Sequence, residues 1–256
     1  MDPGAIITPV SVEFLLESVA FWIRERRSGK FLIFFEGNLL SRLEGNPDLA
    51  RALGNAAFVV ADGIAPATLA SWRYGTKVQR IPGPDFMPQA CEYGVARGWR
   101  HFLYGGGEGV AERLSQILAE RFPGILVVGA YCPPFRPLSA TEDAVVAEMI
   151  ERAGADIVWV ALGGPKQEIW MNEHAGRLRV PVMMGIGAAF DFLTGTRPRA
   201  PVLVRRLGLE WIFRMVTGGP RLFVRNLRVA VVSSWILMQA WFRRKAVVPF
   251  QNEKAG

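Results

Sequence analysis

The stretch Ile157-Val158-Trp159-Val160-Ala161-Leu162-Gly163-Gly164-Pro165-Lys166-Gln167-Glu168 decides the fold. A short apolar run leads directly into a glycine-rich turn and a helix start, which predicts a buried strand, a tight turn and a helix. The same order recurs at Leu103–Gly109 and at Val182–Asp191. In an open parallel sheet, ligands bind outside the carboxyl ends of the strands, where helix N-termini attract anions. Three such turns in one chain therefore predict one shared pocket for a phosphorylated small molecule.

Strand and helix patterns alternate along most of the chain. We expect strands at 30–35, 56–60, 101–104, 125–130, 157–162 and 180–184, and helices at 12–23, 108–121 and 166–178. Ser139 and Glu142 form a capping box before a further helix. This alternation predicts an α/β fold with a Rossmann-like, mostly parallel sheet and helices on both faces. Proline, glycine and arginine cluster at 195–201, so we expect an α/β domain over 1–197 and a C-terminal appendage over 198–256.

The positive charge of the chain is concentrated in this appendage. Residues 1–195 hold 18 Lys/Arg and 21 Asp/Glu, a net charge of −3, whereas residues 196–256 hold 12 and 2, a net charge of +10. Arg221, Arg225 and Arg228 follow helical spacing, and aromatic residues are interleaved with them. A basic amphipathic helical appendage that lies on an anionic membrane surface is the favoured interpretation.

Two alternatives for the appendage remain open. It could be a helix hairpin that packs on the body with a solvated basic face, or a basic stripe that binds nucleic acid. The nearly continuous apolar run at 229–242 favours lipid, because nucleic acid needs no such run. We therefore expect no nucleic-acid partner.

Composition limits the compartment and the class of protein. Half of the residues are apolar and 21% are charged, which excludes a disordered chain. Cys91 and Cys132 are too few for a disulfide framework and fit a reducing cytoplasm. Glu13 and Glu17 interrupt the first apolar segment, which predicts a helix rather than a signal peptide. No apolar run reaches the roughly 18 residues that a bilayer span requires.

The site motifs leave structural and functional interpretations open. The Gly105–Gly109 turn has Val110 where a dinucleotide fingerprint needs glycine, so it is either an anion cradle or a tight turn without a ligand. Asp62 is either a helix cap or a general base, and Asp191 is either a cap or an acceptor for a sugar hydroxyl. Lys166 and Gln167 offer donors that suit a diphosphate or a pyrimidine.

The sequence lacks most of the remaining motifs that are typical of catalytic and metal sites. Glu168 suits the positive end of the helix that Lys166 begins. His101 and His174 receive no role, and His174 is expected at the surface. The sequence has no Ser-His-Asp pattern, no HExxH and no D-x-D, so we expect neither a metal ion nor another cofactor.

Taken together, these residues resemble the bacterial WecG/TagA/CpsF family of glycosyltransferases. The matching stretches follow the family order from about residue 30 to residue 225: Ala61-Asp62-Gly63, Phe102–Gly106, Gly163–Glu168, Gly187–Phe192, Arg199-Ala200-Pro201 and Gly208–Trp211. Glu36-Gly37-Asn38 departs from the Thr-x-Asn that is common in the family, because a carboxylate stands at the threonine position. Asn38 matches. The departure leaves the transferred sugar open between N-acetylmannosamine and another hexose.

The resemblance implies an activity. A UDP-sugar would donate a sugar to a polyprenyl-diphosphate-linked saccharide, with inversion and without a metal, at the cytoplasmic face of the bacterial inner membrane. The protein would be a peripheral membrane protein, and a homo-oligomer is left open. The alternative is a non-catalytic UDP-sugar-binding subunit of an envelope-polymer assembly complex.

The resemblance also implies roles for individual residues. Asp62 would be the catalytic base. The residues expected to bind substrate are Asn38, Gly105, Gly106, Lys166, Gln167, Glu168 and Asp191 of the α/β domain, and Arg214, Arg221 and Arg225 of the appendage, which would close over the diphosphates.

Overall fold

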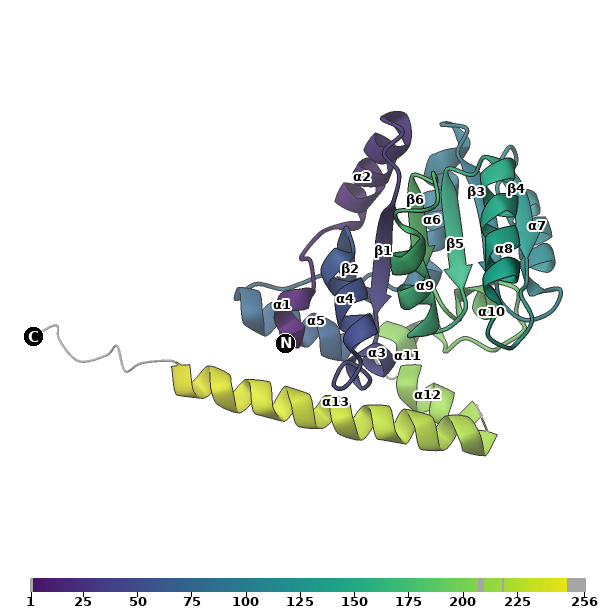
Figure 1. The fold of residues 1–256 in the computed structure, drawn as a ribbon. Helices are drawn as coiled ribbons and strands as arrows, with labels where there is room; N and C mark the ends of the chain where they lie inside the picture. The colour runs from purple at the N-terminus through teal and green to yellow at the C-terminus, as the bar shows by residue number, and fades with distance from the viewer. Residues whose placement is uncertain (1, 207–209, 218, 248–256) are drawn as a thin grey trace, which may run out of the picture.

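A computed structural model describes residues 2–206, 210–217 and 219–247 (Figure 1). The strands are β1 (Lys30–Phe35), β2 (Phe58–Ala61), β3 (Arg100–Gly105), β4 (Leu126–Tyr131), β5 (Ile157–Ala161) and β6 (Val182–Gly185). The helices of the body are α1 (Pro3–Ile6), α2 (Val12–Arg24), α3 (Gly37–Leu40), α4 (Pro47–Asn55), α5 (Ile64–Tyr74), α6 (Gly83–Val95), α7 (Val110–Arg121), α8 (Ala140–Ala153), α9 (Lys166–His174) and α10 (Ala189–Leu193). Those that follow are α11 (Val202–Arg206), α12 (Glu210–Thr217) and α13 (Gly219–Val247).

The six strands form one sheet in the order β2-β1-β6-β5-β3-β4, and every neighbouring pair is parallel. The Rossmann-like α/β fold is thereby confirmed. All six expected strands are present, and their ends differ from the expected ones by at most two residues. Because β6 lies between β1 and β5, the last strand of the sequence joins the two halves of the sheet.

Alternating side chains of each strand enter two separate cores. In β1, Leu32 and Phe34 face the core that α2, α6 and α7 cover, whereas Ile33 and Phe35 face the core that α4, α8 and α9 cover. The two-residue period of a strand produces this division. Strands that are buried on both faces need continuous apolar sequences, which explains the uninterrupted apolar run of β1.

Local signals in the sequence set several helix starts. The capping box before α8 is confirmed, because Ser139 Oγ accepts a hydrogen bond from the Glu142 N–H at 3.3 Å and Glu142 Oε2 accepts one from the Ser139 N–H at 2.8 Å. The helix expected at 12–23 is α2, which Ser11 caps. The helix expected at 166–178 is shorter than predicted and ends at His174.

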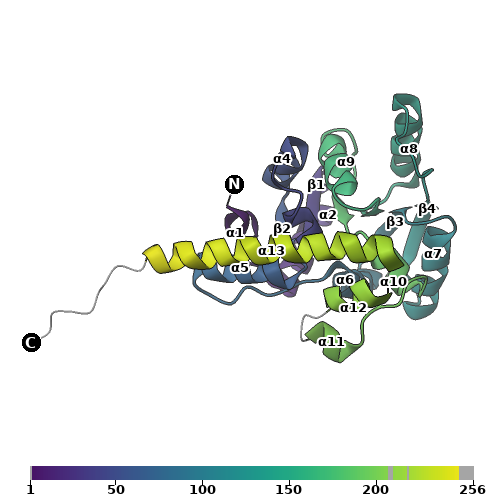
Figure 2. The same ribbon diagram turned by 90° about the horizontal axis from the view of Figure 1, so that it is seen from below.

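The C-terminal helices lie across the edge of the sheet at which the strands end. In Figure 1 the strand arrows point towards α13, and Figure 2 shows α13 crossing this face beside α12. The helix α13 packs on α3 and α5. A Cβ atom added at Gly37 of α3 would lie 3.0 Å from Val229 Cγ1, so the two helices approach closely there. The helical character of the appendage is confirmed, and part of α13 packs on the body.

The other side chains of α13 include many exposed apolar ones. Ile236, Leu237 and Ala240 pack against the second core, whereas Phe223, Trp235, Trp241 and Phe242 are exposed. Within the described ranges, no helix combines the length and apolar character that crossing a bilayer requires.

Candidate active site

All six parallel strands end at the same edge of the sheet, and the ends of neighbouring strands differ in register by at most two residues. Phe35 of β1 pairs with Ala61 of β2, and Ala161 of β5 pairs with Gly105 of β3. Gly185 of β6 pairs with residues of both β1 and β5. The residues that follow these strands therefore form a row in the order Asp62, Glu36, Ile186, Leu162 and Gly106. The edge brings the site residues predicted from different motifs onto one surface.

Asp62 lies at the β2 end of this row. Its N–H donates a hydrogen bond to the Phe35 carbonyl at 3.0 Å, which fixes the turn beside the end of β1. A Cβ added at Gly63 would lie 3.7 Å from the Gly37 nitrogen. The N-cap position of α5 is held by Gly63, not by Asp62. Asp62 therefore does not hold the N-cap position of α5, and its role as a general base remains a prediction.

The glycines after β3 are required by close packing. Gly105 has φ +109°, and an added Cβ would lie 2.6 Å from the carbonyl carbon and oxygen of Ala161. Gly106 has φ +84°, and its N–H donates to the Ala161 carbonyl at 2.9 Å. Only glycine accommodates both the backbone angle and this approach. The turn is therefore tight for structural reasons, and its contact with a ligand remains a prediction.

Gln167 joins two of the turns. Its Oε1 accepts hydrogen bonds from the N–H of Gly163 at 3.2 Å and from the N–H of Gly187 at 3.1 Å. These glycines belong to the turns after β5 and β6. The Gln167 side chain is buried, so it holds the two turns together across the edge of the sheet.

Glu168 lies beneath this junction. Its side chain is 0% exposed, and Oε1 accepts a hydrogen bond from Gln167 Nε2 at 2.7 Å. Oε2 is buried without a hydrogen-bond partner in the described part of the chain. Burial raises the pKa of Glu168 to about 7, and the nearby Glu36 carboxylate raises it as well, whereas the Gln167 bond opposes the shift. Glu168 therefore acts on the turns after β5 and β6 indirectly, through its hydrogen bond with the Gln167 side chain.

Three more predicted residues lie along the same edge. The Asp191 carboxylate forms an ion pair with Arg197 Nε at 3.1 Å. Lys166 is exposed at the start of α9, and its Nζ lies 5.6 Å from the ring centre of Phe135. Asn38 lies in α3, where its carbonyl accepts a hydrogen bond from Ser41 Oγ at 2.9 Å. Substrate contacts of all three remain predictions.

One polar side chain of α13, that of Ser233, lies at this edge. Ser233 Oγ would lie 3.4 Å from a Cβ added at Gly37. Ser233 Oγ and Asn226 Nδ2 are both buried without a hydrogen-bond partner among the described residues.

The three arginines predicted to close over the diphosphates belong to the C-terminal helices. The backbones of Arg214, Arg221 and Arg225 belong to α12 and α13, but their side chains lie outside the described residues. Within the ranges that the structure describes, no group of three or more His, Cys, Asp or Glu side chains could hold a metal ion.

The expectation that His174 lies at the surface is wrong. Its ring is 1% exposed, stacks on Trp170 with ring centres 4.1 Å apart, and places Nε2 3.1 Å from Asp143 Oδ2. Asp143 belongs to α8, 31 residues earlier, so helical periodicity gave no sign of this pair. His101 is also buried, and desolvation lowers its pKa to about 4.

Arg80 is a site neighbour that no motif indicated. The N–H of the next residue, Ile81, donates to the Ala61 carbonyl at 2.8 Å, which places Arg80 beside the Asp62 turn. Arg80 Nη2 donates to the Arg205 carbonyl of α11 at 3.0 Å. The sequence that follows Arg80 is an apolar residue and then Pro-Gly-Pro. This pattern does not indicate a functional site.

A family model described as glycosyl transferase WecG/TagA/CpsF family matches residues 4–247. The chain belongs to this family. It is similar to the N-acetylglucosaminyldiphosphoundecaprenol N-acetyl-beta-D-mannosaminyltransferase of Staphylococcus aureus strain MRSA252, with 26% identity over 202 residues that cover 79% of this chain and 78% of that protein. The protein of the same name from strain NCTC 8325 / PS 47 matches with the same identity and coverage. The resemblance drawn from the motifs is confirmed, and the protein is a glycosyltransferase.

Proposed function

We propose that this glycosyltransferase moves a hexose or N-acetylhexosamine from a UDP-sugar to a polyprenyl-diphosphate-linked saccharide, in the synthesis of an envelope polymer or exopolysaccharide. The names of the staphylococcal relatives give an N-acetylmannosaminyl group and a diphosphoundecaprenol-linked acceptor. The observation that carries the proposal is the row of strand ends, which sets Asp62 beside Glu36-Gly37-Asn38 and on the same edge of the sheet as the turns that Gln167 joins.

The proposed reaction is a metal-independent displacement at the anomeric carbon. Asp62 takes the proton of the acceptor hydroxyl, whose oxygen attacks the anomeric carbon from the side opposite UDP. The bond from that carbon to the diphosphate oxygen breaks, its electron pair leaves with UDP, and the configuration inverts. Positive charge at the diphosphate comes from the backbone N–H groups at the start of α9, from Lys166, and from Arg214, Arg221 and Arg225 of the appendage.

A lipid-linked acceptor suits the position of the appendage. Residues 198–256 are basic, and the exposed aromatic side chains of α13 suit the headgroup region of an anionic membrane. The same helix contacts Gly37, one residue from Glu36 and Asn38. We infer a peripheral enzyme at the cytoplasmic face of the inner membrane. In it, α13 lies between the lipid surface and the edge of the sheet where the strands end.

A transfer assay in liposomes tests the function. The full chain is offered a panel of UDP-hexoses and UDP-N-acetylhexosamines with short polyprenyl-diphosphate-sugar acceptors, and products are read by mass spectrometry. A product with one donor, formed equally with and without EDTA, supports the proposal. UDP binding without a product from any donor supports the non-catalytic subunit instead. A product that EDTA abolishes and Mg²⁺ restores contradicts the metal-independent mechanism.

A further inference from the structure

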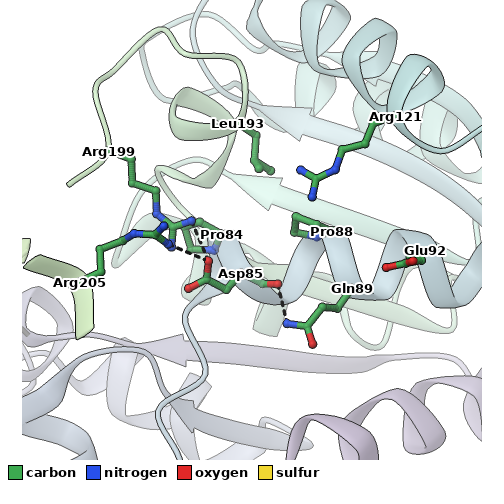
Figure 3. A pocket seen from close by; sticks show the side chains of 9 residues that line it. All are labelled: Pro84, Asp85, Pro88, Gln89, Glu92, Arg121, Leu193, Arg199 and Arg205. Atoms are coloured by element: carbon green, nitrogen blue, oxygen red, sulfur yellow. Dashed lines mark hydrogen bonds and ion pairs between the residues drawn. The ribbon is translucent and has the colours of Figure 1, made fainter. Parts of the chain in front are cut away.

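A groove between α6 and α7 gathers three arginines that the proposed transfer chemistry does not use (Figure 3). The groove has a volume of about 450 Å³, within the range of small-molecule sites. Arg121, Arg199 and Arg205 line it together with two carboxylates, those of Asp85 and Glu92. The formal charge of these five side chains is +1, so the groove attracts anions.

The two arginines on one side are held by a single oxygen atom. Arg199 Nη1 lies 2.8 Å and Arg205 Nη1 lies 3.2 Å from the same atom, Asp85 Oδ1. The Nε atoms of both arginines are buried without a hydrogen-bond partner among the described residues. A guanidinium group carries five N–H donors, so one carboxylate oxygen leaves most of their capacity unused. Phosphate groups, which offer several oxygens to paired guanidinium groups, match this surplus.

The third arginine comes from the other side of the groove. Figure 3 shows Arg121 reaching in from α7, opposite Arg199 and Arg205. In the described part of the chain, Arg121 forms no ion pair, and its guanidinium lies 5.1 Å from the ring centre of the neighbouring Phe122. An arginine in the last turn of a helix favours the helix dipole, but this role does not require a direction into the groove. Arg121 therefore lies on one side of the groove, and Arg199 and Arg205 lie on the other.

We propose that this groove binds a diphosphate group, with Arg121 on one wall and Arg199 and Arg205 on the other. The choice of a diphosphate rests on the proposed function, in which donor and acceptor each carry one. The start of α6 also lies at the groove; it has no side-chain cap and carries Asp85 in its first turn, and its free N–H groups favour an anion. Val202 and Leu203 of α11, between Arg199 and Arg205 in the sequence, are 53% and 68% exposed, so a lipid chain could leave the groove along them. We therefore expect the lipid-linked acceptor to supply the diphosphate.

Calorimetric titration of the full chain with inorganic pyrophosphate tests the site itself. We expect the Kd to rise about tenfold in Arg121→Gln and in Arg205→Gln, because each substitution removes charge-assisted hydrogen bonds. Arg113→Gln is the matched control, since Arg113 is an exposed arginine of the same helix outside the groove. Arg121 is exposed, so its replacement leaves the core intact. Equal affinity of wild type, Arg121→Gln and Arg113→Gln would overturn the proposal. Pyrophosphate binding needs no sugar transfer, so this result is independent of the proposed function.

Two further measurements separate the sources of the diphosphate. In the transfer assay, we expect Arg121→Gln to raise the KM for the lipid-linked acceptor about tenfold and to leave the KM for the UDP-sugar unchanged. A rise in the donor KM alone supports the groove as a diphosphate site but assigns it to UDP. Loss of binding to phosphatidylglycerol vesicles, with unchanged pyrophosphate affinity, would show that the groove binds phospholipid headgroups and would overturn the proposal.

Discussion

Glu168 determines which way the Gln167 amide faces. Because Glu168 Oε1 accepts a hydrogen bond from Gln167 Nε2 at 2.7 Å, the amide oxygen of Gln167 must point away, towards the N–H groups of Gly163 and Gly187. A buried carboxyl group thus holds in place the turns after β5 and β6, at the edge of the sheet where the strands end. The pKa of Glu168, raised to about 7, makes this arrangement sensitive to pH.

We expect Glu168 to make the wild type less stable as pH rises from 5 to 8. An acid whose pKa is raised from 4.5 to about 7 on folding lowers stability progressively above pH 4.5, and the loss is complete above pH 7. The loss amounts to about 3 kcal/mol. Urea unfolding at pH 5 and pH 8 measures it, and Glu168→Gln should remove most of the difference between the two pH values.

Comparing the free energies of unfolding at two pH values separates the titration of Glu168 from the other effects of the substitution. The substitution Glu168→Gln also changes hydrogen bonding, but that effect is the same at both pH values and cancels in the difference. Glu148→Gln is the control, because Glu148 is an exposed partner of Arg152 on α8. If the free energy of unfolding changes equally with pH in the wild type and in Glu168→Gln, the raised pKa does not belong to Glu168.

We expect Gly105→Ala to destabilise the fold by at least about 2 kcal/mol, because the new Cβ meets the Ala161 backbone at 2.6 Å and φ is +109°. Gly54→Ala is the matched control. Gly54 lies in α4 with nothing within 4 Å of an added Cβ, so alanine should stabilise that helix by roughly 0.5–1 kcal/mol. Denaturant unfolding of both variants gives the answer. A Gly105→Ala variant as stable as wild type would mean that the turn after β3 can move away from β5.

Much of the fold could be predicted from local sequence. The apolar run at 157–162 and the glycines after it identify β5 and its turn, because buried strands and left-handed glycines leave direct local signatures. The insertion of β6 between β1 and β5 was not predictable from these patterns, since strand order depends on contacts between distant segments. The Asp85–Arg205 pair spans 120 residues and lay beyond local patterns for the same reason.

The candidate site was predicted less completely. The motifs indicated Asp62 and Gln167, and the structure brings both to the same edge of the sheet, whereas their roles in a site remain predictions. The motif could not show that Glu168 is buried while Lys166, two residues earlier, is exposed, because a helix start has no fixed orientation until it packs. The Ser233 hydroxyl on α13, which has no hydrogen-bond partner among the described residues, was equally hidden within an apolar run.

We expect the exposed aromatic residues of α13 to bind the membrane. Trp235 and Phe242 are 52% and 58% exposed, and replacing both with serine should lower the partition onto anionic vesicles by at least about tenfold. Vesicle sedimentation measures this partition. Phe135→Ser is the control, because Phe135 is fully exposed but belongs to the loop before α8. Vesicle binding that survives the double substitution would exclude these side chains as the anchor.

The most direct test of the central proposal is the transfer rate of Asp62→Asn, measured with saturating donor and acceptor. We expect a loss of about a thousandfold, with UDP affinity and unfolding midpoint near those of the wild type, because the amide keeps the shape of Asp62 but cannot take the proton. Asp48→Asn, an exposed aspartate paired with Arg51 on α4, should retain full activity. A transfer rate of Asp62→Asn within a few fold of the wild type would contradict the assignment of Asp62 as the catalytic base.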